Sequence, residues 1–254
     1  MTVNTLRIVA FGVLALSLVV LGGIGLQALR GQPEIAFEAH ETLPGFRRLQ
    51  LASGSGEIDV LAGVGRGGPP LPDEDVCAAL ATPGVMPVLG PAEAPVRVVS
   101  FSDYRCPHCR VLSPVLLDLA ERGEIRLVMQ EWPVFGPASM LAARAAIAAD
   151  RQGGYAAFHH RLMRTAFAFN DAFLLAVAGE VGLDPDRLRA DMEDPAISTG
   201  IGQAEALSHA LGLRGTPSLV VGRTIVEGAV DPALLRRLIV REAEDPGNAC
   251  PATG

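Results

Sequence analysis

Two cysteines lie two residues apart in the segment Cys106-Pro107-His108-Cys109. This spacing serves three kinds of chemistry: metal binding, a structural disulfide or reversible dithiol–disulfide exchange. Zinc needs four ligands, and neither Cys77, Cys250 nor the adjacent pair His159-His160 has the spacing to complete the set. A purely structural disulfide across two residues is strained and easily reduced. The pattern therefore favours a redox dithiol and no metal site.

The position of the pair favours a reactive thiolate at Cys106. The segment Val96–Phe101, "VRVVSF", is typical of a buried strand, and the apolar spacing after the pair predicts an amphipathic helix that ends near Gly123. Cys106 is therefore expected at a helix N-terminus, where free backbone N–H groups and the helix dipole stabilise an anion. We predict that His108, when protonated, lowers the pKa of the Cys106 thiol further.

The segments around this motif predict one sheet with a helical insertion. A second strand is expected at Ile125–Trp132, and residues from about 137 to 211 have a helical composition broken by Gly, Asn and Asp-Pro. Strand patterns return at "SLVVG" and "RTIVEG", and "DPALLRRLIVREAE" predicts a last helix capped by Asp231. The order is β-α-β, helices, β-β-α, and strands from both ends are expected to share the sheet.

Three motifs resemble those of the DsbA-like thiol–disulfide oxidoreductases of the thioredoxin superfamily. They are "FSDYRCPHC", "EWPVFGPASMLAARAA" and "GLRGTPSLVVG", together with Pro114 inside the first long helix. The resemblance runs from about Val88 to Ala243. It implies an α/β thioredoxin-like fold, here within residues 73–250, interrupted by an inserted helical domain at about 137–211.

The resemblance also implies roles for individual residues. Cys106 would be the exposed nucleophile, Cys109 its shielded partner, and His108 the residue that tunes the pair. Pro217 would be a cis-proline that faces the disulfide. Thr216, before it, would offer backbone groups that pair with an extended segment of the substrate.

Two positions depart from the strongly oxidising members of that family. Ser100 stands where they carry an acidic residue in the strand below the cysteines, and Thr216 is a choice seen among isomerase-like relatives. Asp103 lies close to the pair, and two interpretations stay open for it: a proton carrier or a solvated turn residue. These departures leave open the direction of the exchange, oxidation or isomerisation.

The first thirty residues predict export. Residues 8–29 are uncharged and lie between Arg7 and Arg30. At 1.5 Å per residue they reach roughly 33 Å, enough to cross a bilayer core of about 30 Å. The length favours an uncleaved N-terminal transmembrane helix, with a cleaved signal peptide as the alternative. The short basic head favours a cytoplasmic N-terminus, so we expect the rest of the chain on the periplasmic side, anchored in the inner membrane.

Residues 31–72 are rich in glycine and proline and predict a tether or a loosely ordered arm. Within this segment, "FRRLQL" and "IDVLAGVG" contain enough apolar residues for short strands that dock on the domain, and the two interpretations stay open. Beyond it, Cys77 and Cys250 flank the thioredoxin-like core. We predict a structural disulfide between them, since domain termini often lie close together; two free buried thiols are the alternative.

Together these features predict an extracytoplasmic enzyme that introduces disulfides into exported proteins and needs no cofactor beyond its cysteines. The net charge of −7 argues against nucleic acid as a partner. The resemblance implies a quinone-linked membrane protein as the reoxidant. Two other functions stay open: a disulfide isomerase or reductase, and a copper-handling or chaperone-like protein that binds through the same cysteines.

Overall fold

The computed structural model describes residues 35–50, 73–165, 169–245 and 247. The chain divides into two compact units, Met1–Ala36 and Phe37–Gly254. Nearly all of the described residues belong to the second unit, which contains the cysteine motif.

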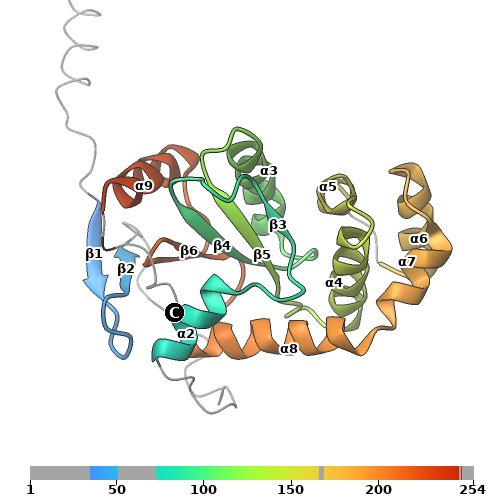
Figure 1. Ribbon diagram of the computed structural model, residues 1–254, viewed down its shortest axis with the longest axis horizontal. Coiled ribbons are helices and arrows are strands. Elements are labelled where there is room, and N and C mark those ends of the chain that lie inside the picture. Colours follow the sequence, from blue (N-terminus) through green and yellow to red (C-terminus); the bar gives the residue numbers. More distant parts are fainter. Residues whose placement is uncertain (1–34, 51–72, 166–168, 246, 248–254) are drawn as a thin grey trace, which may run out of the picture. The chain divides into compact units, whose positions relative to one another are not determined.

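The second unit combines a sheet with helices from several parts of the chain (Figure 1). The strands are β1 (Ala36–Ala39), β2 (Arg47–Gln50), β3 (Val88–Leu89), β4 (Arg97–Ser102), β5 (Arg126–Glu131), β6 (Ser218–Val221) and β7 (Thr224–Glu227). The helices are α2 (Asp73–Ala81), α3 (Pro107–Glu121), α4 (Pro137–Asp150), α5 (Tyr155–Met163), α6 (Asp171–Glu180), α7 (Pro185–Met192), α8 (Pro195–Ala210) and α9 (Pro232–Glu244).

The strands form a single mixed sheet in the order β1-β2-β7-β6-β4-β5-β3. β4 pairs in parallel with β5 and antiparallel with β6. Its apolar residues Val98, Val99 and Phe101 are buried, as expected for a strand covered on both faces. In Figure 1, α3 and α9 lie along one side of the sheet and α8 along the other. This arrangement, with helices α4 to α8 between β5 and β6, confirms the predicted thioredoxin-like α/β fold.

Helix α3 places the cysteine motif at the end of the central strand. Pro107 occupies the first turn, where its missing N–H costs nothing, and Cys106 is the N-cap residue. Farther along the helix, Leu112, Leu116 and Leu119 are buried, and α3 packs against β5. The pair is therefore held between a buried strand and an anchored helix.

The segment before this core contributes two strands. β2 runs parallel to β7, with Arg47 opposite Thr224 and Arg48 opposite Ile225. The strand interpretation of "FRRLQL" is thereby confirmed, whereas "IDVLAGVG" lies outside the described residues. We call the segment Ala36–Gln50, which contains β1 and β2, the N-terminal arm.

Two further predictions concern residues outside the described part of the chain. The apolar segment 8–29 is one of them; among the residues that are described, no helix combines the length and apolarity needed to cross a bilayer. The other is Cys250, the expected partner of Cys77. Cys77 is disulfide-bonded, which agrees with a structural role, and its pairing with Cys250 stays a prediction.

Candidate active site

The site is built from two segments that are far apart in the sequence. Cys106 and Cys109 begin helix α3, and the Thr216–Pro217 loop leads into β6. The Thr216–Pro217 peptide bond is cis, as predicted. The thiol of Cys106 donates to the carbonyl oxygen of Thr216 at 3.2 Å, so the loop faces the reactive sulfur. The backbone N–H of Cys109 donates to Cys106 Sγ at 3.4 Å, as a helix N-cap requires.

The prediction that Cys106 is exposed and Cys109 shielded is wrong in its first half. Cys106 is 2% exposed and Cys109 is 1% exposed. The sulfur of Cys106 lies against the Thr216–Pro217 loop, which no local pattern around Cys106 reveals. The two cysteines therefore differ in hydrogen bonding and charge rather than in overall exposure.

Hydrogen bonds separate the acidities of the two thiols. The hydrogen bond with the Cys109 side chain contributes most to lowering the pKa of Cys106, from 9.0 to about 5, although burial opposes it. Contact with the Thr216 side chain and the backbone N–H groups of Cys109 and His108 act in the same direction. The same hydrogen bond, followed by burial, raises the pKa of Cys109 far above its ordinary value. Cys106 is thus the thiolate and Cys109 the thiol of the reduced pair.

His108 contributes to this effect through its backbone, because its N–H is one of the groups that lower the pKa of Cys106. Its side chain is exposed. The sequence predicted that the imidazole of His108 lowers the pKa of Cys106. That role stays a prediction, and we expect its effect on the pKa to be small because the side chain is exposed.

Replacing His108 by alanine should raise the pKa of Cys106 by about one unit or less, because the charge of an exposed imidazole is screened by solvent. The reduction potential should become slightly more negative, since the reduced form loses stabilisation that the disulfide never had. Thiolate absorbance against pH and equilibration with glutathione measure both quantities. A lowered pKa, or a shift of the potential in the oxidising direction, would contradict the tuning role.

Asp103 holds the loop that precedes the motif. Its carboxylate accepts hydrogen bonds from the backbone of Arg105 at 2.6 Å, from Ser139 Oγ at 2.8 Å, and from the backbone of Val134 and Phe135 at 2.8 and 3.1 Å. Asp103 is 1% exposed, so the solvated-turn interpretation is wrong. The residue instead joins the active-site loop to the segment between β5 and α4.

Serines occupy a small space next to Cys109. Ser100, Ser102 and Ser113 line this small space together with Cys109, Pro217 and apolar side chains. A backbone hydrogen bond with Asp103 and a side-chain hydrogen bond with Ser102 favour the thiolate of Cys109. The hydrogen bond with Cys106 and burial, which both raise the pKa of Cys109, outweigh them.

A buried polar cluster lies beside this space, and the sequence analysis missed it. Tyr104 of the active-site loop and Tyr155 of α5 donate to Glu131 Oε1 at 2.9 and 2.8 Å. Both hydroxyls also contact His159 Nδ1, at 2.7 and 3.0 Å, and His159 Nε2 contacts Ser113 Oγ at 2.7 Å. The one available signal was a charged residue at the end of the apolar run "IRLVM". The cluster connects α3, α5 and the end of β5.

Burial dominates the electrostatics of this cluster. It raises the pKa of Glu131 from 4.5 to about 8, against the effect of the two tyrosine hydrogen bonds, and it lowers the pKa of His159 from 6.5 to about 3. Glu131 Oε2 is buried and has no hydrogen-bond partner within the described part of the chain. Near neutral pH both groups are therefore largely uncharged, which is the state that a dry interior favours.

Comparisons with known proteins agree with this geometry. A family model described as "DSBA-like thioredoxin domain" matches residues 97–240. A thioredoxin-like oxidoreductase from Silicibacter pomeroyi DSS-3 is 41% identical, with a TM-score of 0.62, and the match covers 67% of this chain and 98% of that one.

Two curated relatives each match more than half of the chain. Disulfide bond formation protein D of Bacillus subtilis is 22% identical over 169 residues, which are 61% of this chain and 76% of that protein. Na(+)/H(+) antiporter NhaA 3 of Salinispora tropica is 33% identical over 137 residues, or 53% of this chain. That stretch is 21% of the antiporter, so the similarity spans about a fifth of that relative's length.

Proposed function

The chain belongs to the family of DSBA-like thioredoxin domains, and we propose that it is a thiol–disulfide oxidoreductase that introduces disulfides into exported proteins at Cys106-Pro107-His108-Cys109. The observation that carries this proposal is the set of hydrogen bonds to Cys106 Sγ, which lowers the pKa of that thiol to about 5. A stabilised thiolate favours the reduced enzyme over its disulfide, so the disulfide form is a good oxidant.

The exchange begins with the oxidised enzyme. A substrate thiolate attacks Cys106 Sγ, the Cys106–Cys109 bond breaks, and Cys109 leaves as a thiolate that takes up a proton. The substrate's second thiolate then attacks the substrate sulfur of the mixed disulfide. A substrate disulfide forms, and Cys106 leaves as a thiolate. Two electrons pass from the substrate dithiol to the enzyme, and the raised pKa of Cys109 makes its protonation favourable.

The Thr216–Pro217 loop supplies the substrate-binding surface in this proposal. In the reduced enzyme with a neutral Cys106, the thiol donates to the Thr216 carbonyl. When Cys106 is a thiolate or part of a disulfide, it has no proton to donate, and the carbonyl is available to an N–H of an extended substrate segment. Such backbone pairing tolerates many sequences, which suits an enzyme with many clients.

The place and the partners of the enzyme are part of the same proposal. Disulfide formation needs an oxidising compartment, so the domain acts on the extracytoplasmic side, held at the membrane by residues 8–29. Its substrates are exported proteins that are still folding and carry free thiols. A membrane redox partner linked to quinone reoxidises Cys106 and Cys109.

A disulfide isomerase is the second candidate, and two observations favour it. Ser100 lines the space beneath Cys109 in place of an acidic residue, and Thr216 precedes the cis-proline. An isomerase uses the same cysteines but must be kept reduced.

The redox state of the cysteine pair in cells tests the proposal. Cells are quenched with acid and their thiols are alkylated, and mass spectrometry of the peptide with Cys106 and Cys109 gives the oxidised fraction. We expect a mostly oxidised pair. A mostly reduced pair would overturn the oxidase proposal in favour of the isomerase. Thiols that are protected from alkylation until a copper chelator is added would favour a metal-binding role.

A further inference from the structure

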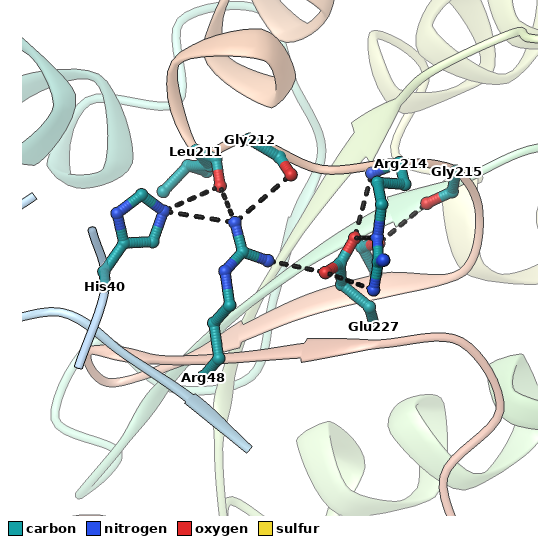
Figure 2. Close-up of polar contacts among 8 residues, drawn as sticks. His40, Arg48, Leu211, Gly212, Arg214, Gly215 and Glu227 are labelled. Atoms are coloured by element: carbon teal, nitrogen blue, oxygen red, sulfur yellow. Dashed lines mark hydrogen bonds and ion pairs between the residues drawn. The ribbon is translucent and has the colours of Figure 1, made fainter. Parts of the chain in front are cut away.

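Arg48 of the N-terminal arm contacts the loop that leads to the cis-proline (Figure 2). Its Nη2 donates to the carbonyl oxygens of Leu211 and Gly212 at 3.1 and 3.2 Å. Its Nη1 forms an ion pair with Glu227 of β7. One side chain therefore joins β2 to the residues that follow α8 and to the last residue of β7.

The two carbonyls are the natural partners of a cation. Leu211 and Gly212 follow the last turn of α8, where helix carbonyls lack intrahelical donors and the helix dipole is negative. Gly212 adopts a positive φ of 61°. A Cβ at this position would lie 2.8 Å from Arg48 Nη2, so a glycine both ends the helix and admits the guanidinium.

His40 of the arm supports the same contact. Its Nδ1 accepts from the backbone N–H of Leu43 at 3.1 Å and that of Thr42 at 3.3 Å, so the ring proton of the neutral imidazole lies on Nε2. Nε2 is 3.2 Å from both the carbonyl oxygen of Leu211 and Arg48 Nη2. With its proton on Nε2 the ring donates to the carbonyl, and its approach to the guanidinium, which has donors only, is then a contact without a hydrogen bond. The arm thus supplies two donors to the end of α8.

Glu227 connects Arg48 to the residues on either side of Thr216. Its Oε1 accepts from the backbone N–H of Arg214 at 2.9 Å, two residues before Thr216. Glu227 also lies opposite Ser218 in the β6–β7 ladder, and the N–H of Gly228 donates to the Pro217 carbonyl at 2.9 Å. The loop Leu211–Pro217 is therefore fixed on both sides of Thr216, whose carbonyl meets Cys106 Sγ.

We propose that the N-terminal arm is part of the active-site scaffold and that Arg48 is a positioning residue, which holds the loop Leu211–Pro217 against the Cys106 sulfur. The arm precedes residues 97–240, so it lies outside the part of the chain that the family model matches. The proposal rests on the proposed role of Thr216 in substrate binding.

Arg47 offers a matched control on the same strand. Its side chain points away from the loop and binds Thr224 Oγ1, Glu242 and Asp245. Arg47 and Arg48 have the same side-chain exposure, 27%. Glu242 is fully buried, so loss of Arg47 removes the ion pair of a buried carboxylate and leaves it only its hydrogen bonds from Thr224 and the Arg223 backbone. This loss should destabilise the fold at least as much as loss of Arg48.

The experiment compares Arg48→Met, Arg48→Lys and Arg47→Met in the full chain. Three quantities are measured: thermal unfolding, the pKa of Cys106 from thiolate absorbance, and KM and kcat with a peptide dithiol. Arg48→Met should raise KM roughly tenfold, equivalent to about 1.4 kcal/mol, because the loop that binds the peptide is no longer held. The pKa of Cys106 should also rise, since the contact of its sulfur with the Thr216 side chain, which favours the thiolate, weakens. Arg48→Lys keeps the charge beside Glu227, so its KM and the pKa of its Cys106 should lie between those of wild type and Arg48→Met.

Arg47→Met should lower the unfolding temperature while leaving the pKa of Cys106 and KM close to wild type. The proposal is overturned if Arg48→Met changes only the unfolding temperature, or if Arg47→Met shifts the pKa and KM as much. The pKa needs neither a client protein nor a redox partner. It therefore reports on the arm even if the direction of the exchange in cells proves to be isomerisation.

Discussion

Replacing Cys106 by serine should reduce dithiol oxidation to background, whereas replacing Cys109 by serine should trap mixed disulfides with substrates. Cys106 is the thiolate of the reduced pair, with a pKa of about 5. In Cys109→Ser this thiolate still attacks a substrate disulfide and releases one substrate thiolate. The mixed disulfide lasts longer than in the wild-type enzyme because the Cys109 thiol, which would attack Cys106 Sγ and release the substrate, is absent. In Cys106→Ser the remaining Cys109 stays protonated and unreactive, because burial still raises the pKa of its thiol when the hydrogen bond with Cys106 is lost.

Each purified variant is incubated with a peptide that contains a disulfide, and non-reducing mass spectrometry measures the covalent complex. The double variant Cys106→Ser/Cys109→Ser is the control and should form none, since Cys77 is already disulfide-bonded. Equal trapping by the two single variants would show that both sulfurs act as nucleophiles and would refute the roles assigned to them.

The chemistry of the site was predictable because its signals are local. The spacing of Cys106 and Cys109, a preceding apolar strand and a following amphipathic pattern together predict a thiolate at a helix N-terminus. Pro217 required the family resemblance, because a Thr-Pro bond gives no sign of its isomer in the sequence. The order from β4 to α9 followed from periodicity, composition and breaker residues, since each of these elements shows its pattern in a short window. The short strands β1 and β3 were not predicted.

The contacts that remained hidden join residues far apart in the chain. Arg48 and Glu227 are separated by 179 positions, and nothing near either residue indicates the other. The exposure of Cys106 was misjudged for the same reason, because the loop that covers its sulfur begins more than a hundred residues later. Local patterns predict which residues react, whereas the covering loops and the residues that hold them depend on the tertiary structure.

The buried polar cluster is a further contact between residues far apart in the chain, and it involves the helical insertion. Tyr104 lies two residues before Cys106, and its hydroxyl meets Glu131 and the α5 residue His159. Ser113 belongs to the active-site helix and meets the other nitrogen of the same imidazole. His159 of the insertion therefore contacts both the active-site loop and α3, in a setting where any net charge is costly.

The charge of Glu131 should make the stability of the protein depend on pH. The pKa of Glu131 is raised by burial from 4.5 to about 8 in the folded protein. Its contribution to stability is fully present below pH 4.5 and is lost as the pH rises through about 8, because the unfolded chain ionises first. His159 has the opposite effect, because burial lowers its pKa from 6.5 to about 3. Its contribution to stability is present above pH 6.5 and is lost as the pH falls toward 3.

Between pH 4.5 and 6.5 the two effects offset each other, and above pH 6.5 only that of Glu131 remains. There the free energy of unfolding should fall by about 1.4 kcal/mol per pH unit up to about pH 8. Glu131→Gln keeps an acceptor for the two tyrosines and cannot ionise. The free energy of unfolding of the variant should therefore match that of wild type at pH 4.5 and exceed it by a growing margin as the pH rises. The difference should reach about 5 kcal/mol once Glu131 is fully ionised.

Urea unfolding of the oxidised protein from pH 4 to 9 measures this difference without interference from the Cys106 thiolate. Glu121→Gln, at an exposed position of α3, is the matched control and should follow the wild-type curve. A difference between Glu131→Gln and wild type that stays constant across this range would mean that Glu131 ionises at the same pH in the folded and unfolded chains. In that case the cluster accommodates the carboxylate, and hydration or a proton shared with His159 must offset the burial of its charge.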